Sequence, residues 1–539
     1  MHISALLKHL VWLNLLTQVV ACQDMPKNSK NQEVSAHSII PVPQQLTISK
    51  NEVFVFQQPL TIKYDNTFSR AASVIKGALT KLGTIETTSN KSNGIQIIRN
   101  TGLSLEEYKI GITKHGVLIE AKTARGAFYA AQTFRQILWT SKIDTKKQTI
   151  TIPAMKIQDK PENKWRGFHT DVSRHFFTKE YLMTIIDRMA LYKLNKFQIH
   201  LTDDQGWRIE IDKYPLLTEI GAYRTFNNQD SVCMERAKTN SDYTIDKRFI
   251  NGAVYGGYYT KEDMREVIAY AAQHFIDIIP EVDMPGHMSA AIRAYPYLSC
   301  TEGAGWGTEF SYPICPCKDE VLEFSFKIWD EIIELFPSDT VHIGADEVEK
   351  GTWESSSLCQ DFMKKNGMTD VNEIQNYYVK ALQKYLEAKG KTVIAWDDVI
   401  EGQVNSNLLM MYWRDYQPDS PTRTAKNGNN IILTPWSWFY LSGENSDSTF
   451  QAMYEYNIKK ELDPIVPDKV LGYQACVWTE TLPSEALYEY YVFPKFQGFA
   501  EVAWASDRNW ETFKNRMKAH YDYMAREKIN FRMPGFASE

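Results

Sequence analysis

Apolar runs of strand length alternate with amphipathic runs of helix length from residue 164 towards the C-terminus. Short, continuous apolar runs are typical of strands buried on both faces, and apolar positions about three to four residues apart are typical of helices. We predict eight strands, over residues 166–172, 196–201, 276–280, 340–344, 392–396, 408–412, 430–433 and 470–477. Helices predicted between them include residues 180–191, 261–274, 320–335 and 372–388. Such strand–helix units predict an α/β fold, a (β/α)8 TIM barrel with long loops, with a doubly wound sheet as the alternative.

Residues 38–158 carry a different pattern, in which short strands and a long helix are mixed. We predict strands at 53–56 and 94–98, a hairpin of 108–112 with 117–121, and a helix over 124–139. These elements predict a small α+β domain over residues 38–158. A polar break at 159–163 then separates this domain from the barrel. The barrel domain covers residues 159–539 and includes a C-terminal helix at 510–526.

The N-terminal residues have the pattern of an export signal. Lys8 and His9 precede an apolar run over 10–21, which is too short to cross a membrane. Small residues lead into Cys22, which resembles the lipidated cysteine of bacterial lipoproteins. We predict a lipoprotein signal peptide at 1–21, lipidation at Cys22 and a polar tether over 22–37; a simple cleaved signal is the alternative. The protein would then be located in the periplasm or at the outer membrane. It would be attached to a membrane by this lipid alone.

The overall composition narrows the class of protein. Among 539 residues, 43% are hydrophobic and 23% charged, which is a globular balance and excludes a wholly disordered chain. Lys and Arg number 60 against 66 Asp and Glu, so there is no basic excess that would favour nucleic-acid binding. Aromatic residues reach 13%, a share that suits a core and also suits stacking against sugar rings.

Six cysteines remain beyond Cys22. The pair Cys315 and Cys317 is spaced too closely for a zinc motif, and no partner pair exists, so we expect no metal site. In an oxidising compartment a disulfide between this loop and Cys300 is compatible with the sequence.

Residues able to do chemistry follow the predicted strands, where a barrel of this kind places its active site. Asp346 and Glu347 give the strongest signal, because adjacent carboxylates at a strand end point in different directions and can serve different atoms of one substrate. A partly desolvated carboxyl near another negative charge has a raised pKa, which suits a general acid. A solvated loop or a cation site is the alternative for such a pair.

Aromatic and charged residues accompany this pair. Trp396, Trp413 and Trp478 each follow a different predicted strand, although the interior of such barrels is usually filled by branched aliphatic residues. Tryptophan faces bind the apolar face of a sugar and exclude water. Arg174 and Glu480 could hold sugar hydroxyls by charge-assisted hydrogen bonds, or form a structural ion pair instead.

Taken together, these segments resemble the family 20 glycoside hydrolases, the β-N-acetylhexosaminidases. The resemblance rests on RGFHTDVSRHFF at 166–177, HLTDDQGWRIEI at 200–211, PEVDMPGH at 280–287, HIGADE at 342–347 and GYQACVWTE at 472–480, and it extends over about 38–510. It implies an exo-acting enzyme that removes terminal β-linked GlcNAc or GalNAc with retention of configuration, without metal or cofactor. In this family the substrate's own 2-acetamido group attacks C1 and forms an oxazolinium ion, an exception to the two-carboxylate scheme.

The resemblance also implies roles for individual residues. Glu347 matches the general acid/base, and Asp346 matches the carboxylate that orients the acetamido group. Asp203 and His287 match a pair that supports Glu347. The residues matched to substrate binding are Tyr440 at the acetamido oxygen, Trp396, Trp413 and Trp478 at the walls, and Arg174 and Glu480 at the hydroxyls of the non-reducing end.

The chain departs from the family pattern at Ser442, where Asp or Asn often helps to bind an outer hydroxyl. The choice between GlcNAc and GalNAc, the tolerance of groups on O6 and the natural glycan therefore stay open. A lacto-N-biosidase-like or other family 20 specificity is the alternative within the family. Three rival hypotheses also stay open. They are a two-carboxylate glycosidase, a non-catalytic glycan-binding lipoprotein and a phosphate-binding barrel; the last is disfavoured because no Gly-rich loop follows the final two strands.

Overall fold

The computed structural model describes residues 38–537, apart from 57–60, 83–93, 145–148 and 302–309. The predicted signal peptide, Cys22 and the tether lie outside the described residues. Among the residues that are described, no helix combines the length and the apolar character needed to cross a membrane.

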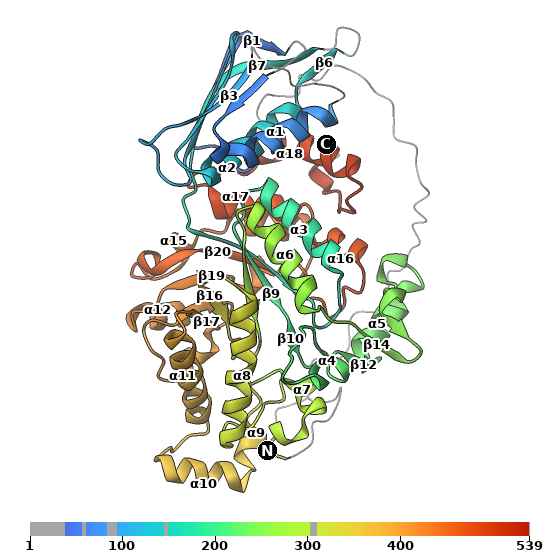
Figure 1. Cartoon of the computed structure of the whole chain (residues 1–539), viewed down its shortest axis with the longest axis vertical. Helices are drawn as coiled ribbons and strands as arrows, with labels where there is room; N and C mark the ends of the chain where they lie inside the picture. Colours follow the sequence, from blue (N-terminus) through green and yellow to red (C-terminus); the bar gives the residue numbers. More distant parts are fainter. Residues whose placement is uncertain (1–37, 57–60, 83–93, 145–148, 302–309, 538–539) are drawn as a thin grey trace, which may run out of the picture. The chain divides into compact units, whose positions relative to one another are not determined.

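The N-terminal domain contains a sheet with strand order β1-β7-β4-β5-β3-β2, and β6 pairs with β7. The strands are β1 (Gln45–Phe56), β2 (Thr61–Tyr64), β3 (Gly94–Arg99), β4 (Tyr108–Thr113), β5 (Gly116–Ala121), β6 (Lys142–Asp144) and β7 (Thr149–Asp159). Helices α1 (Ser69–Lys81) and α2 (Ala124–Trp139) pack against each other, and α2 packs on β4 and β5 (Figure 1, blue). The predicted hairpin and the helix at 124–139 are confirmed, whereas β7 and α1 were not predicted.

The end of β7 differs from the predicted polar break. Asp159 is the last residue of this strand and is buried. Its carboxylate accepts hydrogen bonds from Tyr108 Oη at 2.6 Å and Trp504 Nε1 at 3.1 Å. Lys193 of the barrel lies 3.3 Å from the same carboxylate. A buried carboxylate needs such partners, so Asp159 is a contact of β7 with other elements. Residues 160–163 lie outside helices and strands, with Lys160 and Glu162 exposed, so the predicted break begins one residue later.

In the described part of the chain, eight parallel strands close into a barrel, in the order β15-β16-β17-β18-β19-β20-β8-β9. They are β8 (Trp165–Asp171), β9 (Lys196–His200), β15 (Asp277–Glu281), β16 (Thr340–His342), β17 (Thr392–Trp396), β18 (Leu409–Tyr412), β19 (Ile431–Leu433) and β20 (Val470–Val477). Each overlaps a predicted strand. The predicted barrel is therefore confirmed, and the doubly wound alternative is wrong.

Helices cover the outside of these strands (Figure 1). The main ones are α3 (Lys179–Leu191), α6 (Lys261–Gln273), α8 (Asp319–Leu335), α11 (Asn372–Ala388), α16 (Glu485–Val492), α17 (Lys495–Trp504) and α18 (Trp510–Arg526). Thr178 and Thr260 cap α3 and α6, since each hydroxyl accepts a backbone N–H of the first turn. The four predicted barrel helices and the C-terminal helix are confirmed to within one residue at each end.

Shorter elements fill the loops at the carboxyl ends of the strands. Between β9 and β15 lie β10 (Thr202–Asp203), β11 (Gly206–Trp207), α4 (Leu216–Glu219), β12 (Tyr223–Thr225), α5 (Asn228–Ala237), β13 (Ile250–Asn251) and β14 (Val254–Gly256). Other loops carry α7 (Ser289–Ala294), α9 (Gly351–Glu354), α10 (Ser357–Asn366), α12 (Ser420–Lys426), α13 (Trp436–Phe439), α14 (Asp447–Glu455) and α15 (Ile458–Glu461). These insertions build the walls of the barrel mouth.

Candidate active site

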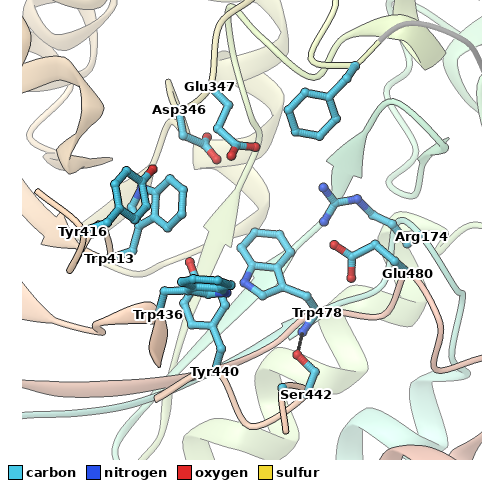
Figure 2. A pocket seen from close by; sticks show the side chains of 12 residues that line it. Arg174, Asp346, Glu347, Trp413, Tyr416, Trp436, Tyr440, Ser442, Trp478 and Glu480 are labelled. Carbon is cyan, nitrogen blue, oxygen red and sulfur yellow. Dashed lines mark hydrogen bonds between the residues drawn. The ribbon is translucent and has the colours of Figure 1, made fainter. Parts of the chain in front are cut away.

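A pocket of about 510 Å³ opens at the carboxyl ends of the barrel strands (Figure 2). Its lining residues are Arg174, Phe310, Asp346, Glu347, Trp413, Tyr416, Trp436, Tyr440, Ser442, Gly443, Trp478 and Glu480. In Figure 2 the two adjacent carboxylates lie at one end of the pocket, Trp478 lies at its centre, and Arg174 and Glu480 lie together at one side. A pocket with aromatic walls and a few convergent polar groups is typical of a small-molecule site.

The turn after β16 explains why Asp346 and Glu347 diverge. Gly344, Ala345 and Glu347 all have positive φ, of 68°, 70° and 47°. Such left-handed conformations are costly for residues with a side chain, and they persist where surrounding groups hold them. Asp283 accepts the N–H of Ala345 at 2.9 Å, and Asp398 accepts that of Glu347 at 3.1 Å. Two carboxylates from neighbouring strands thus hold the turn that aims the acidic pair.

Asp346 is buried at the inner end of the pocket, with 6% of its surface exposed. Burial, and next the nearby carboxyl of Asp283, raise its pKa well above the usual range. Its Oδ1 has no hydrogen-bond partner among the described residues. An unpartnered buried carboxylate oxygen that lines a cavity is an acceptor ready for a ligand N–H, or for a nearby positive charge.

Glu347 lies on the more exposed side of the pocket, with 35% of its side chain accessible. His287 Nε2 is 3.6 Å from its Oε2, and His287 Nδ1 is 3.2 Å from Asp203 Oδ1. Although burial opposes the charged imidazole, Asp203 and its neighbours raise the pKa of His287 well above its usual value. The structure therefore brings Asp203, His287 and Glu347 into one row, as the sequence predicts.

Three of the four aromatic residues matched to the acetamido pocket line it. Trp413 and Tyr440 are stacked with ring centroids 6.3 Å apart, and Tyr440 is 5.9 Å from Trp478. The indole N–H of Trp413 donates to Asp398 at 2.8 Å, which fixes that ring. These faces form a narrow apolar enclosure suited to a flat amide group.

Trp396 is placed differently from the other tryptophans. It is 1% exposed and does not line the pocket; its ring lies 5.9 Å from that of Trp478. Its indole N–H donates to the buried Glu281 at 2.8 Å. The structure makes Trp396 a support of the wall rather than part of its surface.

Arg174 reaches the pocket from the loop after β8. Its Nη2 is 2.6 Å from Asp203 Oδ2, and its guanidinium lies 4.8 Å above the ring of Trp478. Asp171 also holds this loop against the loop after β20, since it accepts the N–H of both Ser173 at 2.8 Å and Thr479 at 3.0 Å. Arg174 is thus paired with Asp203 and Asp171 rather than with Glu480, and it still lines the pocket.

Glu480 lines the pocket beside Arg174, and burial raises its pKa. Ser442 lies at another side, where its hydroxyl accepts the backbone N–H of Trp478 at 3.1 Å (Figure 2). This bond uses a lone pair of the serine oxygen to position the tryptophan. The hydroxyl proton of Ser442 is therefore the group that it can offer to a ligand.

Several lining or supporting residues were not predicted. Phe310, Tyr416 and Trp436 are exposed at the rim, at 61%, 57% and 52%. They lie in long loops, where neither periodicity nor strand ends mark them, although Trp436 precedes Tyr440 by four positions. Asp283 and Asp398 follow predicted strands, and that position was the signal that could have identified them.

Some buried groups offer donor sets that resemble metal sites. One set consists of His169, His200 and Glu281, whose ligand atoms lie within 4.8 Å of one another. Glu281, however, already accepts N–H bonds from Gln198 at 2.7 Å and Trp396 at 2.8 Å. The set is therefore arranged as a hydrogen-bond network with its carboxylate oxygens occupied.

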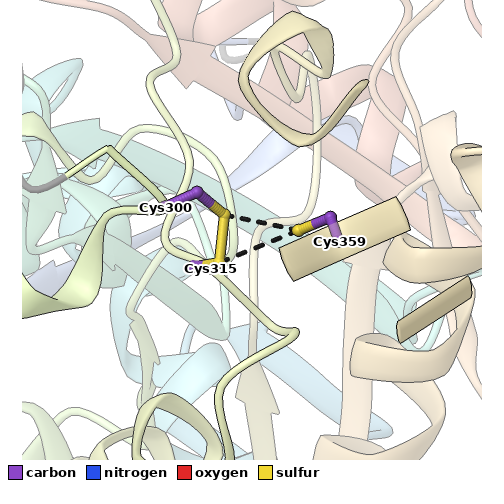
Figure 3. Close-up of side chains that lie close together, drawn as sticks. All are labelled: Cys300, Cys315 and Cys359. Carbon is purple, nitrogen blue, oxygen red and sulfur yellow. Dashed lines mark hydrogen bonds between the residues drawn. A yellow bond between two sulfur atoms is a disulfide. The ribbon is translucent and has the colours of Figure 1, made fainter. Parts of the chain in front are cut away.

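The cysteine cluster is cross-linked. Cys300 pairs with Cys315, and Cys317 pairs with Cys359 on α10. Figure 3 shows Cys359 beside the first of these disulfides, with sulfur separations of 3.4 Å to Cys300 and 3.8 Å to Cys315. The disulfide between Cys300 and this loop, with which the sequence was compatible, is present as the Cys300–Cys315 bond, which joins the chain before and after Phe310.

The fold and the site together define a glycoside hydrolase: a (β/α)8 barrel whose mouth combines adjacent carboxylates, an arginine and aromatic walls. Comparisons with known sequences specify the family. Residues 163–507 match the catalytic domain of glycosyl hydrolase family 20, and residues 36–160 match domain 2 of that family. The chain belongs to glycosyl hydrolase family 20, and its activity is that of a β-N-acetylhexosaminidase.

Individual relatives support this assignment. A beta-hexosaminidase of Porphyromonas gingivalis is 34% identical over 96% of this chain and 67% of its own length. One from Akkermansia muciniphila is 30% identical over 80% of this chain and 86% of its own. Among solved structures, an exo β-N-acetylglucosaminidase of Vibrio harveyi bound to N-acetylglucosamine has a TM-score of 0.80 at 29% identity, covering 95% of this chain and 80% of that one. A β-N-acetylhexosaminidase of Streptomyces coelicolor has a TM-score of 0.76 at 27% identity, covering 93% and 98%.

Proposed function

We propose that the catalytic step uses the substrate's own acetamido group as nucleophile, with Asp346 and Glu347 in separate roles. The unpartnered Oδ1 of Asp346, buried beside the more exposed Glu347, is the observation that carries this proposal. An acetamido N–H can donate to this oxygen while its carbonyl oxygen turns towards C1. The rival two-carboxylate scheme has a carboxylate attack C1 and needs no such arrangement.

Asp346 serves the nucleophile in this mechanism. An amide oxygen is a weak nucleophile in water, but an intramolecular group held in position gains an effective molarity on the order of 10⁵ M or more. As the oxygen bonds to C1, positive charge develops on the amide, and the Asp346 carboxylate stabilises it where water is scarce. Tyr440, which lines the same enclosure, supplies a hydroxyl for the acetamido oxygen.

Glu347 serves the leaving group. Its proton passes to the glycosidic oxygen as the C1–O bond breaks and the oxazolinium ion forms. The resulting carboxylate then accepts a proton from the water that attacks C1, while the C1–O bond of the oxazolinium ring breaks and the acetamido group is restored. Two successive inversions at C1 leave the product in the β configuration. His287 lies 3.6 Å from Glu347, and Asp203 lies 3.2 Å from His287; they fix the orientation of the acid.

The binding mode follows from the groups at the side of the pocket. Arg174 and Glu480 present charged donors and acceptors to hydroxyls of the terminal sugar, which supports exo action. The Vibrio harveyi relative was solved with N-acetylglucosamine, which supports GlcNAc as a substrate unit. Ser442 and Gly443 offer a short neutral surface at another side of the pocket, so we propose that both GlcNAc and GalNAc glycosides are accepted.

We further propose that the enzyme is an exported lipoprotein of the cell envelope, anchored at Cys22, that acts on glycans. The apolar run before Cys22 supports this, as do the disulfides, which are typical of oxidising compartments. Radiolabelled palmitate supplied to expressing cells should enter the protein, and Cys22→Ala should abolish the label. A label that persists in the variant would contradict the anchor.

A panel of aryl β-glycosides tests the proposed function. GlcNAc and GalNAc glycosides should be hydrolysed, glucosides should not, and 6-sulfo-GlcNAc reports the tolerance at O6. Glu347→Gln is the matched control, and it should abolish turnover of phenyl GlcNAc while the fold survives, because its side chain is partly exposed. Undiminished turnover by this variant, or equal hydrolysis of glucosides, would refute the mechanism.

A further inference from the structure

The barrel interior below Trp478 carries polar side chains, although branched aliphatic residues usually fill this space. Glu281 is at the centre of this layer, fully buried at the end of β15. The strand registers place it level with His200 on β9 and His342 on β16. Burying a carboxylate is costly unless other groups bond to it, so its partners indicate its role.

Both oxygens of Glu281 have defined partners. Oε1 accepts the indole N–H of Trp396 at 2.8 Å, and Oε2 accepts the amide N–H of Gln198 at 2.7 Å. His200 Nδ1 lies 3.0 Å from Oε2. The carboxylate thus supports Trp396, which packs against the pocket wall, and at the same time holds one side of an imidazole ring.

The other side of that ring leads to the catalytic acid. His200 Nε2 is 2.8 Å from Asp203 Oδ2, and Asp203 Oδ1 is 3.2 Å from His287 Nδ1. His287 Nε2 is in turn 3.6 Å from Glu347. Carboxylates and imidazoles therefore alternate from the barrel interior to the pocket, and the longest separation, 3.6 Å, is the ion-pair contact between His287 and Glu347.

We propose that Glu281 and His200 are positioning residues for proton donation by Glu347, and that they extend the Asp203–His287 pair into the barrel core. This inference rests on the proposed role of Glu347 as general acid. Glu281 holds His200 in an ion pair, and His200 donates to Asp203. Asp203, together with Asp204, which is hydrogen-bonded to His287 Nδ1 at 3.3 Å, holds the imidazole that lies beside Glu347. The row consists of Glu281, His200, Asp203, His287 and Glu347. No proton has to travel along it, because each member sets the orientation and charge of the next.

The charges along the row agree with this arrangement. Burial opposes a charged His200, yet Glu281 and Asp203 raise its pKa to about 10. Its Nε2 donates to Asp203, and its Nδ1 lies in an ion pair 3.0 Å from Glu281. Despite burial, Arg174 and then His287 hold the pKa of Asp203 well below its usual range. Positive and negative groups thus alternate, which is the arrangement that a buried network needs in order to stay ordered.

The dependence of rate on the leaving group tests the proposal. Phenyl GlcNAc needs protonation of its leaving oxygen, whereas 2,4-dinitrophenyl GlcNAc leaves without it. Glu281→Gln keeps an acceptor for Trp396, but it removes the charge that faces His200 and presents an NH₂ group where Gln198 now donates. We expect kcat for the phenyl glycoside to fall about 10-fold more than that for the dinitrophenyl glycoside, with KM little changed, because acid catalysis acts in the transition state.

His169→Gln is the matched control. His169 Nε2 lies 3.5 Å from Glu281 Oε2, the oxygen that also faces His200, and the His169 ring packs 4.6 Å from that of Trp478. His169 is nevertheless not part of the row. Any loss in this variant should be equal for the two substrates. Equal losses in Glu281→Gln as well would reduce Glu281 to a structural residue and overturn the proposal.

Two further variants keep the outcome decisive. If Glu281→Gln does not fold, His200→Gln carries the same test, because it retains a donor towards Asp203 and removes the bridge to Glu281. In a Glu347→Gln background, Glu281→Gln should leave the remaining turnover of the dinitrophenyl glycoside unchanged, since no acid remains to be positioned. Glu347→Gln alone must show the leaving-group dependence; if it does not, the proposed role of Glu347 fails, independently of the row.

Discussion

Asp346 and Glu347 are adjacent in the chain but differ in surroundings, and the difference defines their chemistry. Asp346 is buried against Asp283, which raises its pKa, whereas Glu347 is accessible and contacts His287. A group whose ionised form is costly in the empty site gains most from a positive charge that appears beside it. The inner residue is therefore suited to the oxazolinium ion and the outer one to the leaving group.

Replacing Asp346 by Asn tests this division at the level of one residue. The amide is nearly isosteric but neutral, so stabilisation of the developing positive charge is lost. We expect kcat/KM for phenyl GlcNAc to fall about 10²-fold or more, comparable to the loss of one preorganised electrostatic group.

A thiazoline that mimics the cyclised intermediate provides the second measurement. It should bind the unmodified enzyme far more tightly than free GlcNAc does, and Asp346→Asn should lose most of that difference. Inhibition constants for both ligands, measured with both proteins, give the comparison. Thiazoline binding no tighter than that of GlcNAc would count against participation of the acetamido group.

The sequence could predict the acidic pair because it follows a strand in a barrel, where chemistry gathers. It could not predict the different placement of Trp396 and Trp413. Both follow strands, but Trp396 is covered by His342, with ring centroids 4.8 Å apart, while Trp413 faces the pocket. Exposure of a side chain depends on what neighbouring strands bring beside it, and a single segment does not carry that information.

At the scale of elements, the turn after β16 depends on a glycine. At Gly344 a Cβ atom would lie 1.8 Å from Asp283 Oδ1, and φ is 68°. Gly344→Ala must therefore displace the carboxylate that holds Ala345. We expect a loss of stability above about 2 kcal/mol, with a fall in kcat that KM does not share, since the turn aims both catalytic carboxylates.

Gly367 offers a matched control for this substitution. Its φ is 67°, nearly the same, but a Cβ there meets nothing within 4 Å. Gly367→Ala should cost only the backbone term, about 1–2 kcal/mol, and should leave kcat unchanged. Thermal unfolding and steady-state kinetics of both variants separate the two effects; similar kcat values for the two would disprove the role of the turn.

The disulfide between Cys317 and Cys359 joins the loop after α7 to α10, across 42 residues of chain. A cross-link of this kind restricts the unfolded chain, so Cys317→Ser should destabilise the protein by about 2–4 kcal/mol. Differential scanning calorimetry with and without reductant checks this. The reductant should lower the unfolding temperature of the unmodified protein more than that of the variant; equal shifts would mean that this bond contributes nothing.

The prediction of helices and strands succeeded where a short stretch of sequence carries the pattern. It failed where contacts with distant parts of the chain decide the structure. The barrel strands are short apolar runs and were located closely. Strand β7 was missed because Pro153 argues against a central strand. In the structure Pro153 pairs with Val53 where the register of β1 and β7 shifts, a site that tolerates the missing N–H. The insertion between β9 and β15 lacks periodicity and was not predicted in detail.

On the scale of the whole molecule, the sequence identified the barrel, the domain that precedes it and the edge that carries the chemistry. It did not reveal that polar groups continue from the pocket into the barrel core. His200 and Glu281 each end a buried apolar run, where they look like strand residues. Their connection to Glu347 depends on the register of two strands far apart in sequence, which the folded structure supplies.

The buried acids also set how stability responds to pH. Burial raises the pKa of Asp283 to about 7, whereas an unfolded aspartate titrates near about 4. The folded protein therefore holds this proton more tightly, and the contribution of Asp283 to stability declines as the pH rises from about 4 to about 7.

Asp283→Asn cannot lose a proton, so the unfolding temperature of the variant relative to the unmodified protein should rise across this range. Scanning fluorimetry from pH 4.5 to 8 measures that difference, in which the titrating groups remote from Asp283 cancel. Asp361→Asn, an exposed change on α10, should leave the difference flat. A flat difference for Asp283→Asn as well would mean that this carboxyl is not protonated in the folded enzyme, and that Asp346 lies beside a full negative charge.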